Sequence, residues 1–330
     1  MRSRPLRVAV WLVTTLLVVC ALLGIAESAL RILVPYRQMP PPEPYRLRWI
    51  KDKHLGHRAQ PGFRARYVDR SRCCGERKVG ISTDERGHRI TVGGGGEGRF
   101  AVFFGCSFTF GWRLDDRETI PSVFASLRPE YRAYNLAFSD YGTSQLLALL
   151  EHKPLRGWIR EDRGVFVYVY ADPHPPRNSG AIGAFTQRRM DSPCYMIEDG
   201  QLVSKGSFRQ ARPVWSWLAR RLCDSRLWMR FNARLPDSHE RELRLTGELI
   251  VASKRRFEAL FPGSRFVVAF YPGSPDAAII RQWVSQRGVE TVDLSRLFKV
   301  QDPRAFLDDD DRHPSPEAAR RFARALAEKL

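Results

Sequence analysis

The sequence predicts an α/β protein in which helices cover both faces of a parallel sheet, with one membrane-spanning helix before it. Two patterns carry this prediction. From residue 100 onwards, short apolar runs alternate with longer segments of helical periodicity. Near the amino terminus, residues 8–26 contain no charged side chain. The alternation indicates the sheet and its covering helices, and the uncharged run indicates the membrane segment.

The first 35 residues are predicted to form a membrane anchor. Arg2, Arg4 and Arg7 precede the uncharged run, whose helical length of about 28 Å is close to the hydrocarbon thickness of a bilayer. Because positively charged flanks stay cytoplasmic, we expect residues 36–330 on the outer side, in the periplasm or at the cell exterior. The alternative is a cleavable signal peptide. The length of the run favours an uncleaved, single-pass anchor.

A proline-rich linker and a small β extension are predicted for residues 36–98. Residues 40–44 are all proline except one, which makes a stiff, extended spacer. Short strands are expected at residues 81–83 and 89–92, on either side of a turn. Residues 93–96 are all glycine and predict a flexible joint into the first core strand.

The main domain is predicted to span residues 99–330. Strands are expected at residues 100–104, 132–137, 164–171, 265–271 and 289–293. Helices are expected near residues 117–128, 143–152, 240–260 and 275–286. A closing helix should begin after Ser315, which is a good N-cap, with Pro316 in the first turn. The apolar strands predict a sheet that is buried on both faces.

Residues 172–238 do not fit this alternation and are predicted to form an insertion. Residues 214–231 are rich in aromatic and basic side chains. They could form a lid, a surface on which sugars stack, or a helix that lies on a membrane. The alternative is an ordinary amphipathic helix that packs on the sheet with its arginines in water.

The candidate chemistry lies at two places that are far apart in the sequence. Ser107 comes just after the expected strand at residues 100–104, where open α/β sheets carry their active residues. Asp310 and His313 stand three residues apart, just before the closing helix. A serine nucleophile needs a base, and the base needs an orienting partner. Ser107, His313 and Asp310 are therefore predicted as nucleophile, base and orienting acid, with Asp309 as the next candidate for the acid.

Three motifs resemble blocks of the SGNH (GDSL-like) hydrolase family. Gly105-Cys106-Ser107-Phe108-Thr109-Phe110-Gly111 is similar to the first block, and residues 135–145 are similar to the second. Residues 82–89 resemble a lead-in of membrane-anchored members. The resemblance covers roughly residues 80–330. It implies a three-layer, flavodoxin-like parallel sheet and an ester hydrolase that uses neither a cofactor nor a metal.

The same resemblance implies the donors that would stabilise an oxyanion. They are the backbone N–H groups of Ser107 and Gly142 and an asparagine side chain of the third block. Here Asp172 stands at the asparagine position, and Asn178, six residues on, is the substitute donor. Cys106 replaces the aspartate of the first block, which leaves Cys106 as an alternative nucleophile.

The expected reaction is removal of an acyl group, acetyl above all, from an envelope carbohydrate or a small ester through an acyl-serine intermediate. The alternatives are an O-acyltransferase, a lipid esterase, and a catalytically degenerate protein that binds glycan or acts as a scaffold. The net charge of +18 suggests an anionic partner or simply a solvated basic surface. The sequence contains no nucleic-acid-binding motif, so no nucleic acid partner is expected.

The cysteines outside the anchor are expected to form disulfides rather than a metal site. No Cys-x-x-Cys or His-x-x-x-His spacing supports zinc. Adjacent Cys73 and Cys74 are expected not to bond each other, and one of them to pair with Cys194 or Cys223. Connectivity does not follow from sequence alone.

Overall fold

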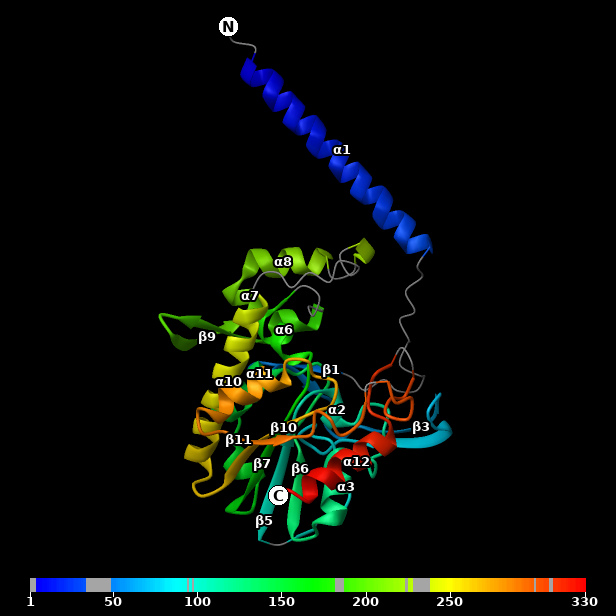
Figure 1. Ribbon diagram of the computed structural model, residues 1–330, viewed down its shortest axis with the longest axis vertical. Coiled ribbons are helices and arrows are strands. Elements are labelled where there is room, and N and C mark those ends of the chain that lie inside the picture. Colours follow the sequence, from blue (N-terminus) through cyan, green and yellow to red (C-terminus); the bar gives the residue numbers. More distant parts are fainter. Residues whose placement is uncertain are drawn as a thin grey trace.

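The computed structural model describes residues 4–33, 49–93, 95–96, 98–181, 187–222, 225–227, 238–299, 301–308 and 311–330. Helix α1 (Arg4–Leu33) extends away from the body of the protein (Figure 1). Within it, Arg7–Leu33 has a mean hydropathy of 2.7 and its most apolar part is not buried at all. This helix is long and apolar enough to cross a membrane. Its orientation across a membrane stays a prediction.

A five-stranded parallel sheet forms the centre of the body, in the order β11-β10-β7-β5-β6. Its members are β5 (Arg99–Phe104), β6 (Tyr131–Asn135), β7 (Arg163–Tyr170), β10 (Arg265–Phe270) and β11 (Glu290–Asp293). The predicted fold class and all five predicted strands are confirmed. The order places β5 inside the sheet, as expected for a strand with apolar residues on both faces.

Helices cover both faces, which gives three layers (Figure 1). Helices α3 (Ile120–Leu127) and α12 (Pro316–Ala327) contact each other on one face, and α4 (Thr143–His152), α10 (His239–Leu260) and α11 (Ala277–Ser285) lie on the other. Strand β5 shows the alternation directly. Phe100, Val102 and Phe104 join the core on the α4 and α10 side. Ala101 and Phe103 join the core on the α3 and α12 side.

Two antiparallel hairpins precede the sheet. They are β1 (Trp49–Asp52) with β2 (Gly56–Ala59), and β3 (Arg64–Ser71) with β4 (Gly75–Ser82). Tyr67 and Val79 of the second hairpin belong to the same core as β5, so the extension packs on the main domain. The turn after β4 needs a glycine, because a Cβ at Gly87 would lie 2.3 Å from the carbonyl oxygen of Ala59.

The insertion packs beside the sheet against α4 and α10. It contains α6 (His174–Ser179), the 3-10 helix η2 (Gln187–Asp191), the hairpin β8 (Pro193–Glu198) and β9 (Gln201–Ser207), α7 (Phe208–Ala211) and α8 (Pro213–Leu222). Its described residues enclose a minor core of Met190, Cys194, Phe208 and Ala219. The remaining short helix of the main domain, α5 (Leu155–Trp158), follows α4.

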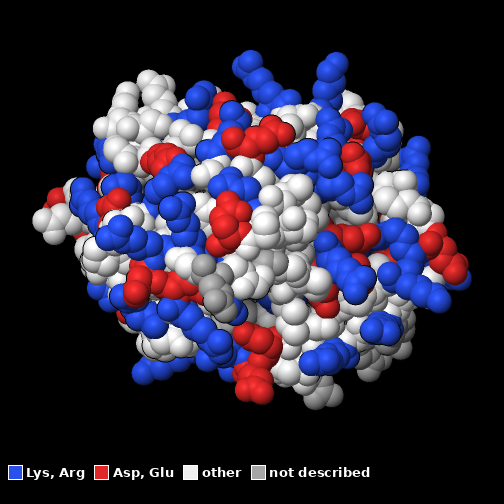
Figure 2. Space-filling view, turned by 90° about the horizontal axis from the view of Figure 1, so that it is seen from below, with Lys and Arg blue, Asp and Glu red and all other residues white. Residues whose placement is uncertain are grey.

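The basic charge is widely distributed on the face of the protein that lies opposite α1. On the face opposite α1, lysine and arginine side chains are spread widely and acidic side chains lie between them (Figure 2). This face therefore resembles an ordinary solvated surface with an excess of positive charge rather than one concentrated anion-binding patch.

Candidate active site

Ser107 is the first residue of the short helix α2 (Ser107–Phe110), which follows β5 after two residues. The turn between them is tight at Gly105, where a Cβ would lie 2.4 Å from the Thr109 hydroxyl oxygen. Because Ser107 begins a helix, its backbone N–H has no acceptor one turn earlier. The turn thus holds the serine at the carboxyl edge of the sheet, 7% exposed.

The end of the chain brings His313 to this serine. Two contacts hold the loop before α12: the N–H of Leu307 donates to the carbonyl of His313 at 3.0 Å, and Ser315 caps the helix. The His313 Nε2 atom lies 2.8 Å from the Ser107 Oγ atom, although 206 residues separate them. The rings of Phe108 and Trp112 lie beside the imidazole, with centroids 5.5 and 5.9 Å away.

The carboxylate on the other side of the imidazole belongs to Asp311. Its Oδ1 atom lies 2.5 Å from His313 Nδ1 and also accepts a hydrogen bond from the backbone N–H of His313 at 3.1 Å. This is the two-residue turn that aspartate side chains favour. Asp310 and Asp309, the acids that spacing favoured, lie outside the described residues. The partner of His313 among the described residues is Asp311, whose carboxylate folds back on its second neighbour.

Arg113 holds this carboxylate from behind. Its Nη1 atom donates to Asp311 Oδ2 at 2.9 Å and to Asp308 Oδ2 at 2.8 Å, and its Nε atom donates to Asp69 Oδ1 at 2.7 Å. Burial alone would raise the pKa of Asp311, but the hydrogen bonds from His313 and Arg113 outweigh it and hold that pKa well below its usual range. Asp311 is therefore ionised over the working range of a histidine base.

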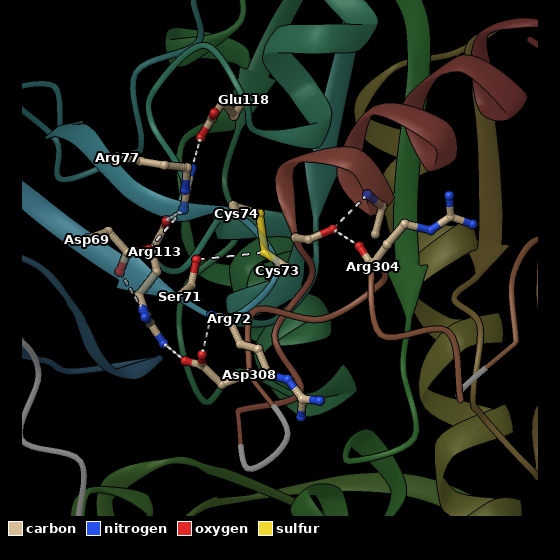
Figure 3. Close-up of a disulfide and its surroundings, with 12 residues drawn as sticks. Asp69, Ser71, Arg72, Cys73, Cys74, Arg77, Arg113, Glu118, Arg304 and Asp308 are labelled. Atoms are coloured by element: carbon tan, nitrogen blue, oxygen red, sulfur yellow. Dashed lines mark hydrogen bonds and ion pairs between the residues drawn. A yellow bond between two sulfur atoms is a disulfide. The ribbon is translucent and has the colours of Figure 1, made fainter.

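The turn of the β3–β4 hairpin supports the same loop (Figure 3). The backbone N–H of Arg72 donates to Asp308 Oδ1 at 2.7 Å, and that of Cys73 donates to the Leu307 carbonyl at 3.2 Å. The expectation that Cys73 and Cys74 would not bond each other is wrong, because the two form a disulfide within this turn. The tight turn directs the two adjacent side chains to the same side. Neither pairing expected for them occurs here: Cys194 is buried in the insertion, and Cys223 lies outside the described residues.

Gly142, an expected oxyanion donor, is engaged elsewhere. It precedes α4, and its backbone N–H donates to the Gln145 side-chain oxygen at 2.8 Å. This contact is a helix-capping interaction, which satisfies the N–H group within the scaffold. Gly142 can therefore reach an oxyanion only after the Gln145 side chain has moved.

Asn178, the expected substitute donor, forms a bridge between three helices. Its Oδ1 atom accepts from the Ser144 N–H at 3.1 Å, and its Nδ2 atom donates to Thr143 Oγ1 and Thr246 Oγ1 at 3.0 and 2.9 Å. The hydrogen-bonding capacity of its amide nitrogen is thus used for packing α6 against α4 and α10. Asp172 follows β7 as an exposed residue. The structure does not place either side chain on Ser107.

A partly buried ion cluster that the sequence did not indicate lies next to the Ser107 turn. The loop that carries Asp140 is joined to the Ser107 turn by one hydrogen bond, in which the N–H of Phe138 donates to the Gly105 carbonyl at 3.4 Å. Asp140 Oδ1 accepts from Arg189 Nη2 at 3.0 Å and lies 3.7 Å from Arg177 Nη2. Burial lowers the pKa of Arg189 to about 10, although the charge of Asp140 acts to raise it. The charges of the two arginines outweigh burial at Asp140 and hold its pKa well below the usual range.

Two other residues that follow the ends of strands β5 and β7 lie in the interior. Cys106 is 1% exposed and belongs to the core on the α3 and α12 side, so it packs as an apolar residue. His174 is fully buried, and its Nδ1 atom lies 2.7 Å from the Tyr168 hydroxyl. Burial holds the pKa of His174 well below its ordinary value, so this imidazole is neutral. Among the described residues, no group of three or more His, Cys, Asp or Glu side chains could hold a metal ion.

Comparisons with known proteins give only distant likenesses. No protein-family model and no curated protein matches the chain. An acetylxylan esterase from Geobacillus stearothermophilus is 14% identical with a TM-score of 0.42, over 73% of this chain and 96% of that one. A member of the lipolytic protein G-D-S-L family from Veillonella parvula is 8% identical with a TM-score of 0.39, over 70% and 97%. Likenesses this weak carry no argument about activity, so the function must follow from this chain's own side chains.

Proposed function

We propose that the chain is a serine esterase that removes an O-acyl group through an acyl-serine intermediate. One observation carries the proposal: Ser107, His313 and Asp311 form a continuous chain of hydrogen bonds, 2.8 Å and 2.5 Å long. A serine hydroxyl becomes nucleophilic when an oriented imidazole takes its proton. Asp311 accepts from Nδ1–H, which leaves the lone pair of Nε2 directed at the serine hydroxyl.

The reaction follows from this arrangement. The Ser107 Oγ atom attacks the ester carbonyl carbon while its proton passes to His313 Nε2. When the tetrahedral intermediate collapses, the bond to the alcohol oxygen breaks and the imidazolium gives its proton to that oxygen. A water molecule then attacks the acyl-serine while its proton passes to His313. When the bond between the acyl carbon and Ser107 Oγ breaks, the acid leaves and the imidazolium returns the proton to Oγ. Asp311 stabilises the imidazolium in both halves.

The oxyanion would be stabilised by backbone N–H groups at the starts of α2 and α4. The Ser107 N–H is the donor already in position, because it has no helical acceptor. The Gly142 N–H would become a second donor once the Gln145 side chain releases it. The esterase therefore needs a small rearrangement of the Gln145 side chain when substrate binds.

The proposed substrate is an acetylated carbohydrate of the cell envelope. Trp112 is half-buried beside His313, and an aromatic ring of this kind offers a face to a sugar ring. The apolar α1 would keep the enzyme at a membrane with its main domain outside the cytoplasm. Both features support an extracytoplasmic ester of a sugar hydroxyl rather than a soluble metabolite.

The test is turnover of an aryl acetate by the full chain in detergent, next to Ser107→Ala and His313→Ala. We expect phenol release by the wild type and a loss of at least about a thousandfold in both variants. Acetylated xylan and acetylated acidic polysaccharides would then show which carbohydrate is the better substrate. Wild-type turnover no faster than that of Ser107→Ala, with no acyl-enzyme in the mass spectrum, would overturn the proposal. An acyl-enzyme that discharges only to a sugar would identify a transferase instead.

A further inference from the structure

Helix α8 (Pro213–Leu222) exposes an apolar stripe where a surface helix normally carries polar residues. Val214, Trp217 and Leu218 are 78%, 60% and 37% exposed. They are spaced three and four residues apart and so lie on one face of the helix. Arg221 continues the stripe, and its guanidinium lies 5.7 Å from the Trp217 ring centroid.

The opposite face of α8 is fixed, so the outward direction of the stripe is a property of the fold. Trp215 Nε1 donates to the Gly180 carbonyl at 3.1 Å, and Ser216 Oγ donates to the Phe208 carbonyl at 2.9 Å. Ala219 is completely buried in the minor core of the insertion. Turning the stripe inward would break these contacts and expose Ala219.

The charged residues of the segment that carries the stripe are all basic, although one of them, Arg209, pairs with Asp191 from outside the segment. Residues 208–222, which form α7 and α8, include four arginines and no acidic residue. Arg220 and Arg221 are exposed at the carboxyl end of α8. Apolar side chains next to arginines are the composition of helices that lie in the headgroup layer of an anionic membrane.

The position of α8 relative to α1 gives an independent reason. Glu27, the residue after the uncharged run, accepts hydrogen bonds from Ser225 Oγ at 2.8 Å and from the N–H groups of Arg226 and Leu227 at 2.9 Å each. Only three residue steps lead from Leu222 to Ser225, which limits the separation to about 11 Å. Where α1 leaves the hydrocarbon, the end of α8 must therefore be close by. Figure 1 shows α8 on the side of the body that faces α1.

We propose that α8 lies in the headgroup layer of the anionic phospholipid membrane that α1 spans, with Val214, Trp217 and Leu218 inserted. The proposal rests on α1 being a membrane span and is independent of the esterase activity. Figure 1 also shows α2 and α6, which follow β5 and β7, on the α1 side of the sheet, with the carboxyl terminus away from it. Docking of α8 would thus hold the Ser107 edge of the sheet towards the membrane surface.

The test uses the full chain in vesicles, with a protease site placed at residues 40–44 so that the domain can be cut from α1 after assembly. Vesicles of phosphatidylcholine with and without phosphatidylglycerol are sedimented after cleavage. We expect the cut domain to stay with the anionic vesicles. Added salt should release it, because salt screens the attraction between the arginines and the anionic headgroups. Replacing Val214, Trp217 and Leu218 together by serine should weaken retention by at least about tenfold.

The matched control is Ile279→Ser, since Ile279 is a 52% exposed apolar residue on a different helix, α11. Retention of this variant should equal that of the wild type. Retention of the triple serine variant at the wild-type level would show that the Glu27 contact or another surface holds the domain, which overturns the proposal. Release of the wild-type domain from both kinds of vesicle would overturn it as well. The circular dichroism spectrum of each variant shows that it is folded.

Discussion

Two neighbouring regions at the carboxyl edge of the sheet contain similar polar residues that have different roles. In the first, the Ser107 region, the residues are Ser107, His313, Asp311 and Arg113. In the second, the Asn178 region, they are Asn178, Gly142, Asp140 and Arg189. The Ser107 region forms an ordered series from arginine to carboxylate to imidazole to hydroxyl. The Asn178 region directs its hydrogen bonds and charges into the scaffold itself.

The difference between the regions shows what separates a reactive residue from a structural one. In the Ser107 region, the hydrogen bonds from Arg113 through Asp311 and His313 lead to one hydroxyl that can attack a substrate. In the Asn178 region, the amide of Asn178 has protein partners on both its oxygen and its nitrogen. Residue type and position at a strand end are shared by both regions. The two regions differ in whether their hydrogen bonds lead to a reactive group or to other parts of the scaffold. Mutations that change activity without stability, or stability without activity, can test this difference.

The largest expected effect is loss of the nucleophile. Ser107→Ala should lower kcat by about 10⁶, His313→Ala by a similar factor, and the double variant by no more than either, because the groups act as one unit. The control from the neighbouring loop is Ser139→Ala, which removes another buried serine hydroxyl. Its rate should stay within about threefold of wild type, as expected away from a reacting group. Equal losses in Ser107→Ala and Ser139→Ala would remove the distinction between the regions. Rates on an aryl acetate measure all four.

The next effect concerns the two acids that share Arg113. Asp311→Asn should lower kcat by about 10⁴, because the amide cannot hold the imidazole in the tautomer whose Nε2 accepts the serine proton. Asp308→Asn is the matched control, since Asp308 also binds Arg113 but is bonded on its other oxygen to the Arg72 N–H. Its rate should fall by less than about tenfold. A larger loss in Asp308→Asn than in Asp311→Asn would place the orienting acid elsewhere in the loop.

The sheet was predictable because its strands are apolar on both faces, as in β5 and β7, and because clear caps mark α12. The β3–β4 hairpin was predicted only at its end. Asp69 and Ser71 occupy inward positions of β3, and Asp69 is completely buried. A buried carboxylate at such a position interrupts the apolar alternation that identifies a strand. It is tolerated here because Arg113 and Arg77 pair with it, and sequence does not show that pairing.

For the site, the sequence predicted the residues that element boundaries mark. Ser107 begins a helix after a buried strand, and His313 stands just before a capped one. The acid depends instead on the backbone of one loop, where the carboxylate of Asp311 bonds the N–H two residues on. Spacing alone could not choose it over Asp310. No local sequence pattern predicts the role of Arg113, because its three carboxylate partners come from two distant segments.

A third prediction tests the Asn178 region. Asn178→Ala should lower the free energy of unfolding by about 2–3 kcal/mol, because it leaves buried groups of α4 and α10 without their partner. Its kcat should fall by less than about tenfold. An oxyanion donor would behave in the opposite way, with a loss of about 10² to 10³ in kcat and little change in stability. Chemical unfolding and aryl acetate kinetics on the same preparation distinguish the two results.

The smallest expected effect concerns acid stability, to which both regions contribute one carboxylate. Asp140 and Asp311 have folded-state pKa values below the usual 3.8, so their stabilisation is complete above that value and is lost as the pH falls below it. The free energy of unfolding should thus decrease from pH 5 to pH 3. Asp140→Asn should reduce this decrease by about 1 kcal/mol. Asp162→Asn, at a side chain 91% exposed, should leave it unchanged. Equal pH dependence in wild type and Asp140→Asn would mean that the Arg189 ion pair adds no stability, which would leave the Ser107 region as the main electrostatic contributor.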